Sequence, residues 1–383
     1  MRLEGVSKRF ADDGVAAVEC LDLDIAAGSI VALIGPSGCG KTTTLRMINR
    51  LVEPSAGTIM IGDVDVTSLE PTELRRGIGY VIQQVGLFPH RTIAQNMATV
   101  PKALGWDRAR IAGRVDELVE LVGLDPALLT RYPDELSGGQ QQRVGVARAL
   151  AADPPVLLMD EPFGAVDPIV RARLQDELLS LQEQLRKTIV LVTHDIDEAV
   201  RLGDRVALLN TGGVLEQYAS PDEMLAQPAN AFVEQFIGED RGIKRLQLRT
   251  VGELPFHRGP VLDADRSAED ARALATSTNS EWIGLLEHDR FVGWVHLDEL
   301  SPGRALHDLH PELPAAVLTS DSTLRTAMDL IMATDTSVAV IEDHGRFAGV
   351  VTLEQIRKGL RVPAGRSVSA VDDAPAGQQV ADA

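Results

Sequence analysis

The chain contains only two cysteines, Cys20 and Cys39, so it cannot carry the disulfide framework of a small secreted domain and suits a reducing compartment. It also lacks any apolar run near the roughly 20 residues that a membrane-spanning helix needs, and its N-terminus has no secretory signal pattern. Lysine and arginine are outnumbered by aspartate and glutamate, 37 to 56, and the net charge of −19 argues against nucleic-acid binding and against direct adsorption to an anionic membrane. We therefore expect a cytosolic protein that reaches a membrane only through a partner.

Apolar residues make up 44% of the 383 residues and charged residues 24%, a balance typical of globular proteins of two or three domains. Short apolar runs at 30–34, 77–82, 156–159 and 188–193 have the character of buried parallel strands, and helical stretches separate them. This alternation predicts an α/β fold whose sheet is covered on both faces. The period is helical from about 92 to 150, so this block is predicted to be a helical insertion between two segments of the sheet.

The phosphate-binding loop pattern G-x-x-x-x-G-K-[ST] is matched at every fixed position by Gly35, Pro36, Ser37, Gly38, Cys39, Gly40, Lys41 and Thr42. A strand-like run precedes the loop and helix-compatible residues follow from Thr43, so successive backbone N–H groups would point at a polyphosphate. Lys41 is expected to reach the β- and γ-phosphates, and the Thr42 hydroxyl to hold Mg²⁺. A chance glycine-rich turn is the alternative, which this context disfavours. Cys39 is either a reactive thiol at a helix N-terminus or a small residue that fits the turn, and we favour the second interpretation.

Two later segments place polar groups where anions or metals bind. A second anion-binding helix terminus is predicted at Ser137, Gly138, Gly139 and Gln140, which precede a helix at 141–151. Asp160 ends the strand at 156–159, where phosphate-loop ATPases hold Mg²⁺ through a second ligand. Glu161 follows it and can orient and deprotonate the attacking water. Each segment alone would be an ordinary turn, but their order behind a phosphate loop favours function.

Two further strands end in a polar residue. His194 follows the strand at 188–193 and could contact a γ-phosphate or a water, although a histidine at a strand end is more often a surface residue. Gln83 follows the strand at 77–82 and can bridge Mg²⁺, the water and the helical insertion, with Gln84 as the alternative for that role.

An internal repeat begins near residue 250. Moving the chain by 56 residues places Val261-Leu262 on Val317-Leu318 and Arg290-Phe291-x-Gly293 on Arg346-Phe347-x-Gly349. Each copy has the pattern of a strand, a helix, two hairpin-like strands and a helix, which predicts two stacked supersecondary units. The last residues, 361–383, are rich in Ala, Gly, Pro, Asp and Gln and are expected to be disordered.

The motif series resembles the nucleotide-binding subunits of ATP-binding-cassette (ABC) transporters over about residues 1–240; its members are Lys41, Gln83, Ser137, Asp160, Glu161, Asp167 and His194. The resemblance implies an ABC ATPase cassette with a RecA-like core and a helical subdomain at about 87–150. ATP would be sandwiched in a head-to-tail homodimer, between Gly35–Thr42 of one copy and Ser137–Gln140 of the other. Roles follow from the resemblance: catalysis for Glu161, His194 and Gln83, Mg²⁺ binding for Thr42, Gln83 and Asp160, and ATP binding for the two loops with Thr43.

The resemblance assigns two more residues to the ATP site. Phe10 matches the aromatic position that stacks on adenine, although a lone phenylalanine is commonly a core residue. Asp167 matches the loop that communicates between the two sites of the dimer, and the residues before it, Gly164-Ala165-Val166, depart mildly from the usual Ser-Ala-Leu. The segment 86–90 resembles the importer branch and would receive a short helix from a transmembrane permease. The protein would then be peripheral, at the cytoplasmic face of the membrane, and would depend indirectly on a substrate-binding protein.

The repeat resembles a pair of CBS modules, α+β units expected at about 251–305 and 306–360 behind a linker at 241–250. A CBS pair behind an importer ATPase resembles the subunits that take up glycine betaine, choline, carnitine or proline. The alternatives are an importer ATPase for another amine or an amino acid and, less favoured, an ABC ATPase without a permease. The cassette never touches the cargo, so the cargo depends on the resemblance alone.

The repeat departs from the nucleotide-binding CBS pattern. The position of the ribose-binding Asp carries Glu299 in the first copy and Gln355 in the second, while the Thr position is His296 and Thr352. A sensory role with a regulatory nucleotide and a structural, dimer-forming role therefore both remain open. Residues 246–360 contain 18 acidic and 10 basic side chains, a balance that does not predict adhesion to anionic lipid.

Overall fold

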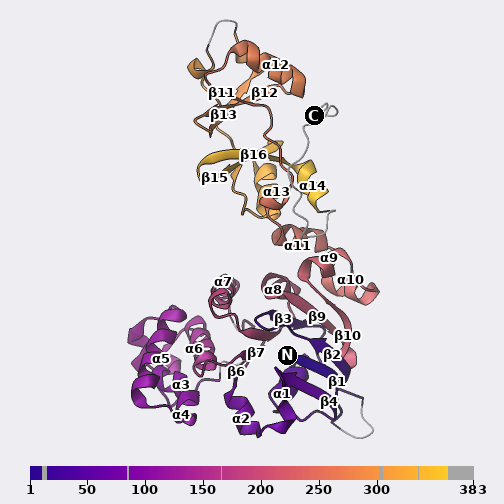
Figure 1. Ribbon diagram of the computed structural model, residues 1–383, viewed down its shortest axis with the longest axis vertical. Coiled ribbons are helices and arrows are strands. Elements are labelled where there is room, and N and C mark those ends of the chain that lie inside the picture. The colour runs from indigo at the N-terminus through magenta and orange to yellow at the C-terminus, as the bar shows by residue number, and fades with distance from the viewer. Residues whose placement is uncertain (11–14, 84–85, 165, 302–304, 335, 361–383) are drawn as a thin grey trace. The chain divides into compact units, whose positions relative to one another are not determined.

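The computed structural model describes residues 1–10, 15–83, 86–164, 166–301, 305–334 and 336–360 (Figure 1). The chain divides into two compact units, Met1–Glu239 and a second that begins at Asp240. Gln84, the alternative to Gln83, and the expected disordered tail at 361–383 both lie outside the described residues. None of the helices in the described ranges is both long enough and apolar enough to cross a membrane.

Two sheets form the first unit. The six strands of the larger sheet are β3 (Ile30–Ile34), β6 (Ile78–Val81), β7 (Val156–Asp160), β8 (Thr188–Val192), β9 (Arg205–Asn210) and β10 (Val214–Ala219). Their order is β10-β9-β3-β8-β7-β6, with every pair parallel except β9 with β10. The smaller sheet is antiparallel and consists of β1 (Arg2–Lys8), β2 (Val18–Asp24), β4 (Ala56–Ile61) and β5 (Val64–Asp65).

The helices of this unit fall into two groups. The predicted helical insertion is confirmed by α3 (Ile93–Met97), α4 (Thr99–Ala103), α5 (Arg108–Leu121) and α6 (Gly138–Leu150), which gather beside β6 (Figure 1). The remaining helices are α1 (Lys41–Ile48), α2 (Pro71–Arg76), α7 (Pro168–Leu185), α8 (Ile196–Leu202), α9 (Pro221–Ala226) and α10 (Ala231–Ile237).

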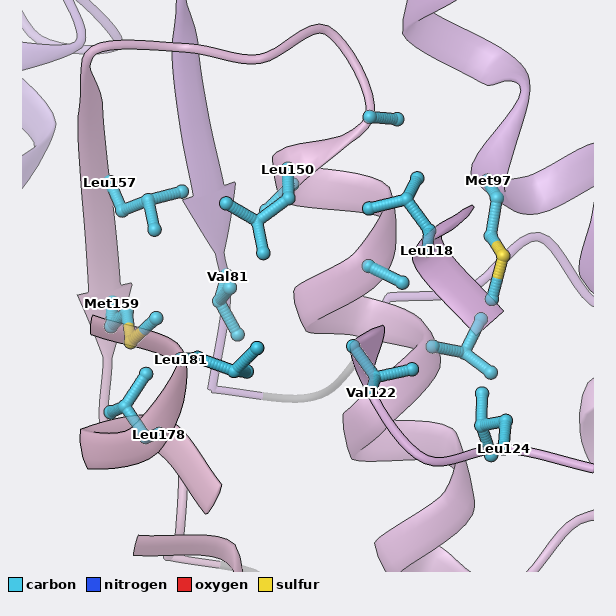
Figure 2. Packing of buried hydrophobic residues seen from close by; sticks show 14 of the residues in the cluster. Val81, Met97, Leu118, Val122, Leu124, Leu150, Leu157, Met159, Leu178 and Leu181 are labelled. Atoms are coloured by element: carbon cyan, nitrogen blue, oxygen red, sulfur yellow. The ribbon is translucent and has the colours of Figure 1, made fainter. Parts of the chain in front are cut away.

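The central strands are buried on both faces, as their continuous apolar runs predict. In β8, Ile189 and Leu191 belong to one core cluster, while Val190 and Val192 belong to a second, because successive side chains of a strand point to opposite faces. The first cluster joins the sheet to the helical block: strand residues such as Val81 and Met159 meet Leu118 of α5 and Leu178 of α7 (Figure 2). The strand ends are therefore held in fixed positions relative to α6 and α7.

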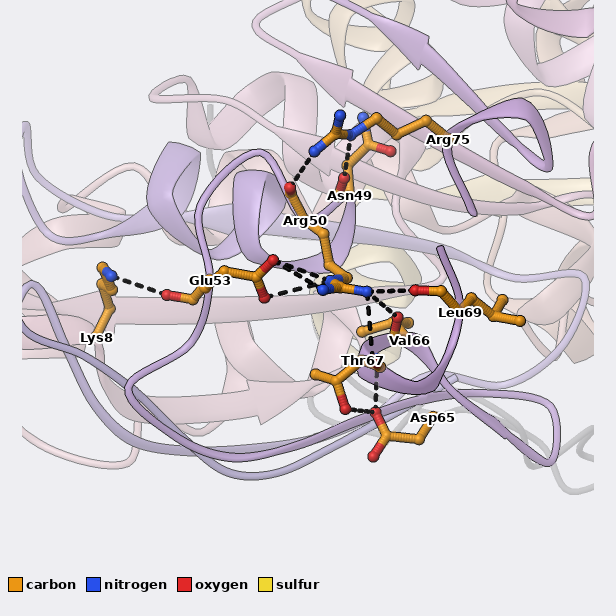
Figure 3. A network of polar contacts seen from close by, with 9 residues as sticks. All are labelled: Lys8, Asn49, Arg50, Glu53, Asp65, Val66, Thr67, Leu69 and Arg75. Atoms are coloured by element: carbon orange, nitrogen blue, oxygen red, sulfur yellow. Dashed lines mark hydrogen bonds and ion pairs between the residues drawn. The ribbon is translucent and has the colours of Figure 1, made fainter. Parts of the chain in front are cut away.

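A polar network fixes the far end of α1, the helix that follows the phosphate loop. Arg50 donates from Nη1 to the carbonyl oxygens of Val66 (3.1 Å) and Leu69 (2.5 Å), and its Nη2 lies 2.9 Å from Glu53 Oε1 (Figure 3). Arg75 of α2 donates to the carbonyl oxygens of Asn49 and Arg50. Carbonyl groups at a helix C-terminus have no partner within the helix, and Arg75 satisfies those of the C-cap residue Asn49 and of Arg50. Arg50, just after the helix, ties the segment 66–69 to the end of α1.

The second unit contains two sheets of the same design. Its elements are α11 (Arg241–Leu248), β11 (Val261–Asp263), α12 (Ala268–Thr278), β12 (Trp282–Glu287), β13 (Arg290–His296), β14 (Val317–Leu318), α13 (Leu324–Ala333), β15 (Val338–Asp343), β16 (Arg346–Thr352) and α14 (Leu353–Gly359). In each sheet the first strand pairs parallel with the second, which pairs antiparallel with the third. β13 and β16 begin and end 56 residues apart, so the sequence repeat corresponds to a structural one.

Two details of this unit differ from the sequence prediction. The segment 241–250, predicted to be a linker, contains α11, because Leu246 is only 3% exposed and packs into the core of the second copy. The helix predicted at the end of the first copy is a single 3₁₀ turn, Leu297–Glu299, whereas the second copy continues into α14. Leu300 and Ser301, which follow that turn, are not helical.

Candidate functional site

The phosphate loop connects β3 to α1, and its backbone requires glycine at two positions. Gly35 has φ +145° and Gly40 has φ +104°, both in the region that side-chain-bearing residues rarely adopt. A Cβ atom at Gly35 would lie 2.1 Å from the Leu209 carbonyl oxygen, and one at Gly40 would lie 2.5 Å from the Ala17 carbonyl oxygen. The loop therefore keeps its close turn only with glycine at these positions.

Lys41 starts α1 and is 7% exposed. Its Nζ donates to the carbonyl oxygens of Gly35 (2.8 Å) and Pro36 (3.0 Å), so the ammonium group lies inside the curve of the loop. Cys39 Sγ is 3.6 Å from the same Nζ, and Cys39 is 1% exposed within the core. This burial accords with the interpretation of Cys39 as a small residue that fits the turn.

Thr42 and Asp160 form the pair that was predicted to hold Mg²⁺. The Thr42 hydroxyl donates to Asp160 Oδ1 at 3.0 Å. Burial at the end of β7 raises the pKa of Asp160 above its ordinary value, and the charge of Glu161 adds to this, while the Thr42 hydrogen bond and Arg46 oppose it. A hydroxyl and a carboxylate oxygen suit Mg²⁺, which takes one or two protein ligands beside phosphate oxygens and water. No cluster of three or more His, Cys, Asp or Glu side chains able to hold a metal by itself occurs among the described residues.

Gln83 and His194 both contact the carboxylate of Glu161. Gln83 Nε2 donates to Glu161 Oε2 at 2.8 Å, and His194 Nδ1 lies 3.3 Å from Glu161 Oε1. The three residues follow β6, β7 and β8, which are adjacent parallel strands, so their carboxyl ends share one edge of the sheet. Glu161 has φ +46°, and its backbone N–H donates to the Val192 carbonyl oxygen at 2.9 Å, a constraint that aims the side chain at the loop.

A pocket of about 430 Å³ opens in front of the phosphate loop, Glu161 and His194. It is lined by Ala17, Ser37, Gly38, Gly40, Lys41, Thr42, Thr43, Glu161 and His194. The phosphate loop, Glu161 and His194 therefore face the same space, whereas Gln83 and Asp160 line a separate pocket. Phe10 does not line this pocket, but it is 68% exposed with Lys8 Nζ 5.2 Å from the ring centre, so the core interpretation of this residue is wrong.

The residues Ser137–Gln140 and Asp167 stand outside that pocket, each at the start of a helix. Ser137 Oγ accepts from the Gln140 N–H at 3.3 Å, and Gln140 Oε1 accepts from the Ser137 N–H at 2.9 Å, which is a capping box. Asp167 Oδ1 accepts from the N–H groups of Ile169 and Val170, both at 3.1 Å, and caps α7. Ser137, Gly138 and Asp167 are exposed, so these helix starts are available to another molecule.

Sequence reasoning missed the residues that support His194. Thr193 and Asp195 flank it, and the Thr193 hydroxyl accepts from the Asp195 N–H (3.1 Å) and donates to Glu198 Oε2 (3.0 Å). The pattern Asp195-x-x-Glu198 is a helix-start signal that could have been read from the sequence. The capping pattern Ser137-x-x-Gln140 was equally readable.

The pH dependence of protein stability tests whether Glu198 is buried beside His194 in this way. It is 6% exposed, and burial raises the pKa of its carboxyl to about 7, with Asp195 adding to the effect and Thr193, Arg171 and His194 opposing it. Between pH 4.5 and 7 the folded state keeps a proton that the unfolded state has released, so stability falls as pH rises through this window. Glu198→Gln should raise the free energy of unfolding at pH 8 by up to ~3 kcal/mol and leave it nearly unchanged at pH 4.5. Urea unfolding at both pH values measures this, with the exposed Glu183→Gln on α7 as control; an equal shift at both values would contradict it.

The positions that hold ribose in nucleotide-binding CBS modules are engaged in helix starts. The Thr352 backbone N–H donates to Gln355 Oε1 at 2.8 Å, and Thr352 Oγ1 accepts from the Gln355 N–H at 3.2 Å. In the first copy the His296 N–H donates to Glu299 Oε1 at 3.4 Å, and His296 Nδ1 accepts from the Asp298 N–H at 3.3 Å. In both copies these side chains therefore serve local structure.

Comparisons with known proteins agree with this geometry. The family model described as ABC transporter matches residues 18–164, and the model described as CBS domain matches residues 308–362. The osmoprotectant import ATP-binding protein OsmV of Salmonella typhimurium is 44% identical over 93% of this chain and 95% of its own length. The glycine betaine/carnitine/choline transport ATP-binding protein OpuCA of Bacillus subtilis is 45% identical over 92% of this chain and 94% of its own.

Among solved structures, a dimeric ATP-binding cassette in a post-hydrolysis state, bound to ADP and phosphate, superposes with a TM-score of 0.52. It is 34% identical and covers 57% of this chain and 98% of its own. The fold prediction of an ABC cassette followed by a CBS domain is thus confirmed. With relatives this similar along almost its whole length, the chain belongs to the family of ATP-binding subunits of ABC importers of the osmoprotectant type, and it is an ABC ATPase with a C-terminal CBS domain.

Proposed function

We propose that this chain hydrolyses ATP to drive an importer for quaternary-amine osmoprotectants, of the glycine betaine, choline, carnitine and proline group. The observation that carries the ATPase mechanism is the meeting of Gln83 and His194 on the Glu161 carboxylate, beside the Thr42–Asp160 pair. The cargo is carried over from the relatives, whose names include glycine betaine, carnitine and choline.

The site residues divide the chemistry between them. Lys41 and the backbone of the phosphate loop bind the β- and γ-phosphates of ATP, and Thr42, Asp160 and Gln83 hold Mg²⁺. When bound, Mg²⁺ neutralises part of the phosphate charge. Glu161 accepts the proton of the attacking water, since its carboxylate faces the pocket that the phosphate loop lines. His194, 3.3 Å from that carboxylate, orients the water or the γ-phosphate, and Phe10 offers an exposed ring on which adenine can stack.

A second copy of the chain completes the site. Ser137–Gln140 form an exposed helix N-terminus outside the pocket of their own chain, and such a terminus binds anions. ATP would lie between Gly35–Thr42 of one copy and Ser137–Gln140 of the other, and a dimeric solved relative supports this arrangement. Binding closes the dimer because each nucleotide contacts both copies, and loss of the γ-phosphate contacts opens it.

The permease would bind at a groove next to Gln83. This groove of about 310 Å³ has apolar residues, among them Ile78, Tyr80 and Phe88, and its arginines include Arg75 and Arg76. Phe88 is 38% exposed, so an amphipathic helix with acidic residues would complement the groove in shape and charge. The protein would be peripheral at the cytoplasmic face of the membrane, and a substrate-binding protein would act through the permease.

The C-terminal unit would be a CBS pair, in which the first copy of the repeat is a CBS module as well as the second. Both copies have the same strand pairing, which supports two modules. The capping boxes at His296 and Thr352 favour a structural role over recognition of a regulatory nucleotide.

Uptake measurements test the proposed function. The chain is produced together with a permease and a substrate-binding protein of the osmoprotectant type, in cells that lack their own osmoprotectant importers. ATP-dependent uptake of labelled glycine betaine, choline, carnitine or proline should appear with the native chain and disappear with Lys41→Ala. Uptake of another amine or an amino acid instead would show that the importer carries a different cargo. If the chain failed to co-purify with any membrane protein, the importer role would be overturned.

A further inference from the structure

One arginine connects the Asp167 loop with the turn that carries His194. Arg171 lies in the first turn of α7, and its Nη2 donates to the Val166 carbonyl oxygen at 3.3 Å. Its Nη1 lies 3.7 Å from Asp195 Oδ2, so the same guanidinium group reaches the residue after His194. The two loops are 27 residues apart in the sequence, between 167 and 194, and the arginine brings them into one contact network.

Several hydrogen bonds hold the turn that carries His194. Asp195 uses Oδ1 to accept from the N–H groups of Asp197 (2.8 Å) and Glu198 (3.3 Å), which caps α8, and this leaves Oδ2 for Arg171. The Thr193 hydroxyl bonds both to the Asp195 N–H and to Glu198. His194 is therefore held between two bonded neighbours while its Nδ1 stays 3.3 Å from the Glu161 carboxylate. A shift of Asp195 would move the imidazole with it.

We propose that Arg171 is a positioning residue that transmits the state of the Asp167 loop to His194. The guanidinium group is planar and rigid, so a displaced Val166 carbonyl changes where its other nitrogen meets Asp195. Asp167 is exposed beside this contact, and it is the residue through which the proposed dimer would act. Binding of the second copy would thereby set the distance between His194 and Glu161. The inference depends on the proposed dimeric mechanism and names one residue that couples its two sites.

The expected effect is on turnover and not on folding or ATP binding. The side chains of Arg171 and Asp195 are each about one third exposed, and ion pairs of this kind contribute little to protein stability. A catalytic group that is displaced by ~1 Å, in contrast, can cost up to ~100-fold in rate. Arg171 does not line the pocket of the phosphate loop, so the affinity for ATP should be preserved.

Steady-state ATPase kinetics of the full chain, assembled with its permease, test this inference. Arg171→Ala should lower kcat by about tenfold and leave KM for ATP within about twofold. Arg171→Lys, which keeps the charge toward Asp195, should recover part of the loss. Asp195→Asn keeps the cap of α8, should lower kcat to a similar extent, and should add nothing to Arg171→Ala in the double variant. Arg173→Ala is the matched control, because Arg173 is exposed on the same helix and pairs only with Glu177 among the contacts described.

Three outcomes would overturn the inference. Native kcat in Arg171→Ala would show that no coupling passes through this residue. If Arg171→Lys lost as much kcat as Arg171→Ala, and both variants had a lower melting temperature, the role of Arg171 would be structural only. Additive losses in the double variant would place Arg171 and Asp195 on separate paths. Absence of ATPase activity in the native assembly would instead refute the proposed function itself, and the two failures are thus distinguishable.

Discussion

Glu161→Gln should abolish ATP turnover while it leaves ATP binding and dimer formation intact. The variant keeps the size of the side chain and its contacts with Gln83 and His194, but it cannot accept the proton of the attacking water. Loss of a general base of this kind costs ~100- to 10,000-fold in rate. Lys41 and the Thr42–Asp160 pair are untouched, so the nucleotide should still bind. Phosphate release measures the turnover.

Dimer formation is the second readout of the same variant. ATP that is bound and not hydrolysed should hold two copies together, so light scattering in ATP should detect a stable dimer of Glu161→Gln and a transient one of the native chain. Glu183→Gln is a suitable control because Glu183 is exposed on α7 and has no role in the pocket. Near-normal turnover in Glu161→Gln would remove this residue as the base.

The position of the candidate site at one edge of the sheet could be predicted from the sequence, because this position depends only weakly on strand order. Asp160, Glu161 and His194 each follow a buried apolar run, and the carboxyl ends of parallel strands meet at one edge whatever their neighbours are. The position of β3 between β8 and β9 could not be read from the sequence, since apolar runs do not identify their partners. The fold class was accessible for the same reason: alternation of strands and helices specifies layers more strongly than it specifies topology.

Contacts made by single polar side chains were not accessible. Arg171 is one of many arginines, and only the packed structure shows that it contacts both Val166 and Asp195. The helix in 241–250 was missed because its apolar face is short and becomes visible only when Leu246 packs against the second copy of the repeat. Periodicity is a weak signal over eight residues, and tertiary packing decides such segments.

The proposed sharing of ATP between two copies predicts a second large effect, which is seen only when two variants are mixed. Lys41→Ala removes the ammonium group of the phosphate loop. Ser137→Asp places a negative charge where the second copy would meet the γ-phosphate, and it keeps α6 intact, because Asp is as good a helix cap as Ser. Each variant alone has no complete site in its homodimer and should lose ~100-fold or more of its ATPase activity.

A heterodimer of the two variants contains one complete site. It combines the native phosphate loop of the Ser137→Asp copy with the native Ser137–Gln140 segment of the Lys41→Ala copy, while its other site has both defects. Random pairing of equal amounts should therefore restore up to roughly a quarter of the native activity, since about half of the dimers are mixed and each has one of two sites. Ser137→Asn, another good cap without the charge, separates repulsion of the phosphate from damage to the helix. If mixing restores nothing although mixed dimers form, ATP is not shared between copies; because Ser137–Gln140 lie outside the pocket of their own chain, these residues would then have no route to the nucleotide.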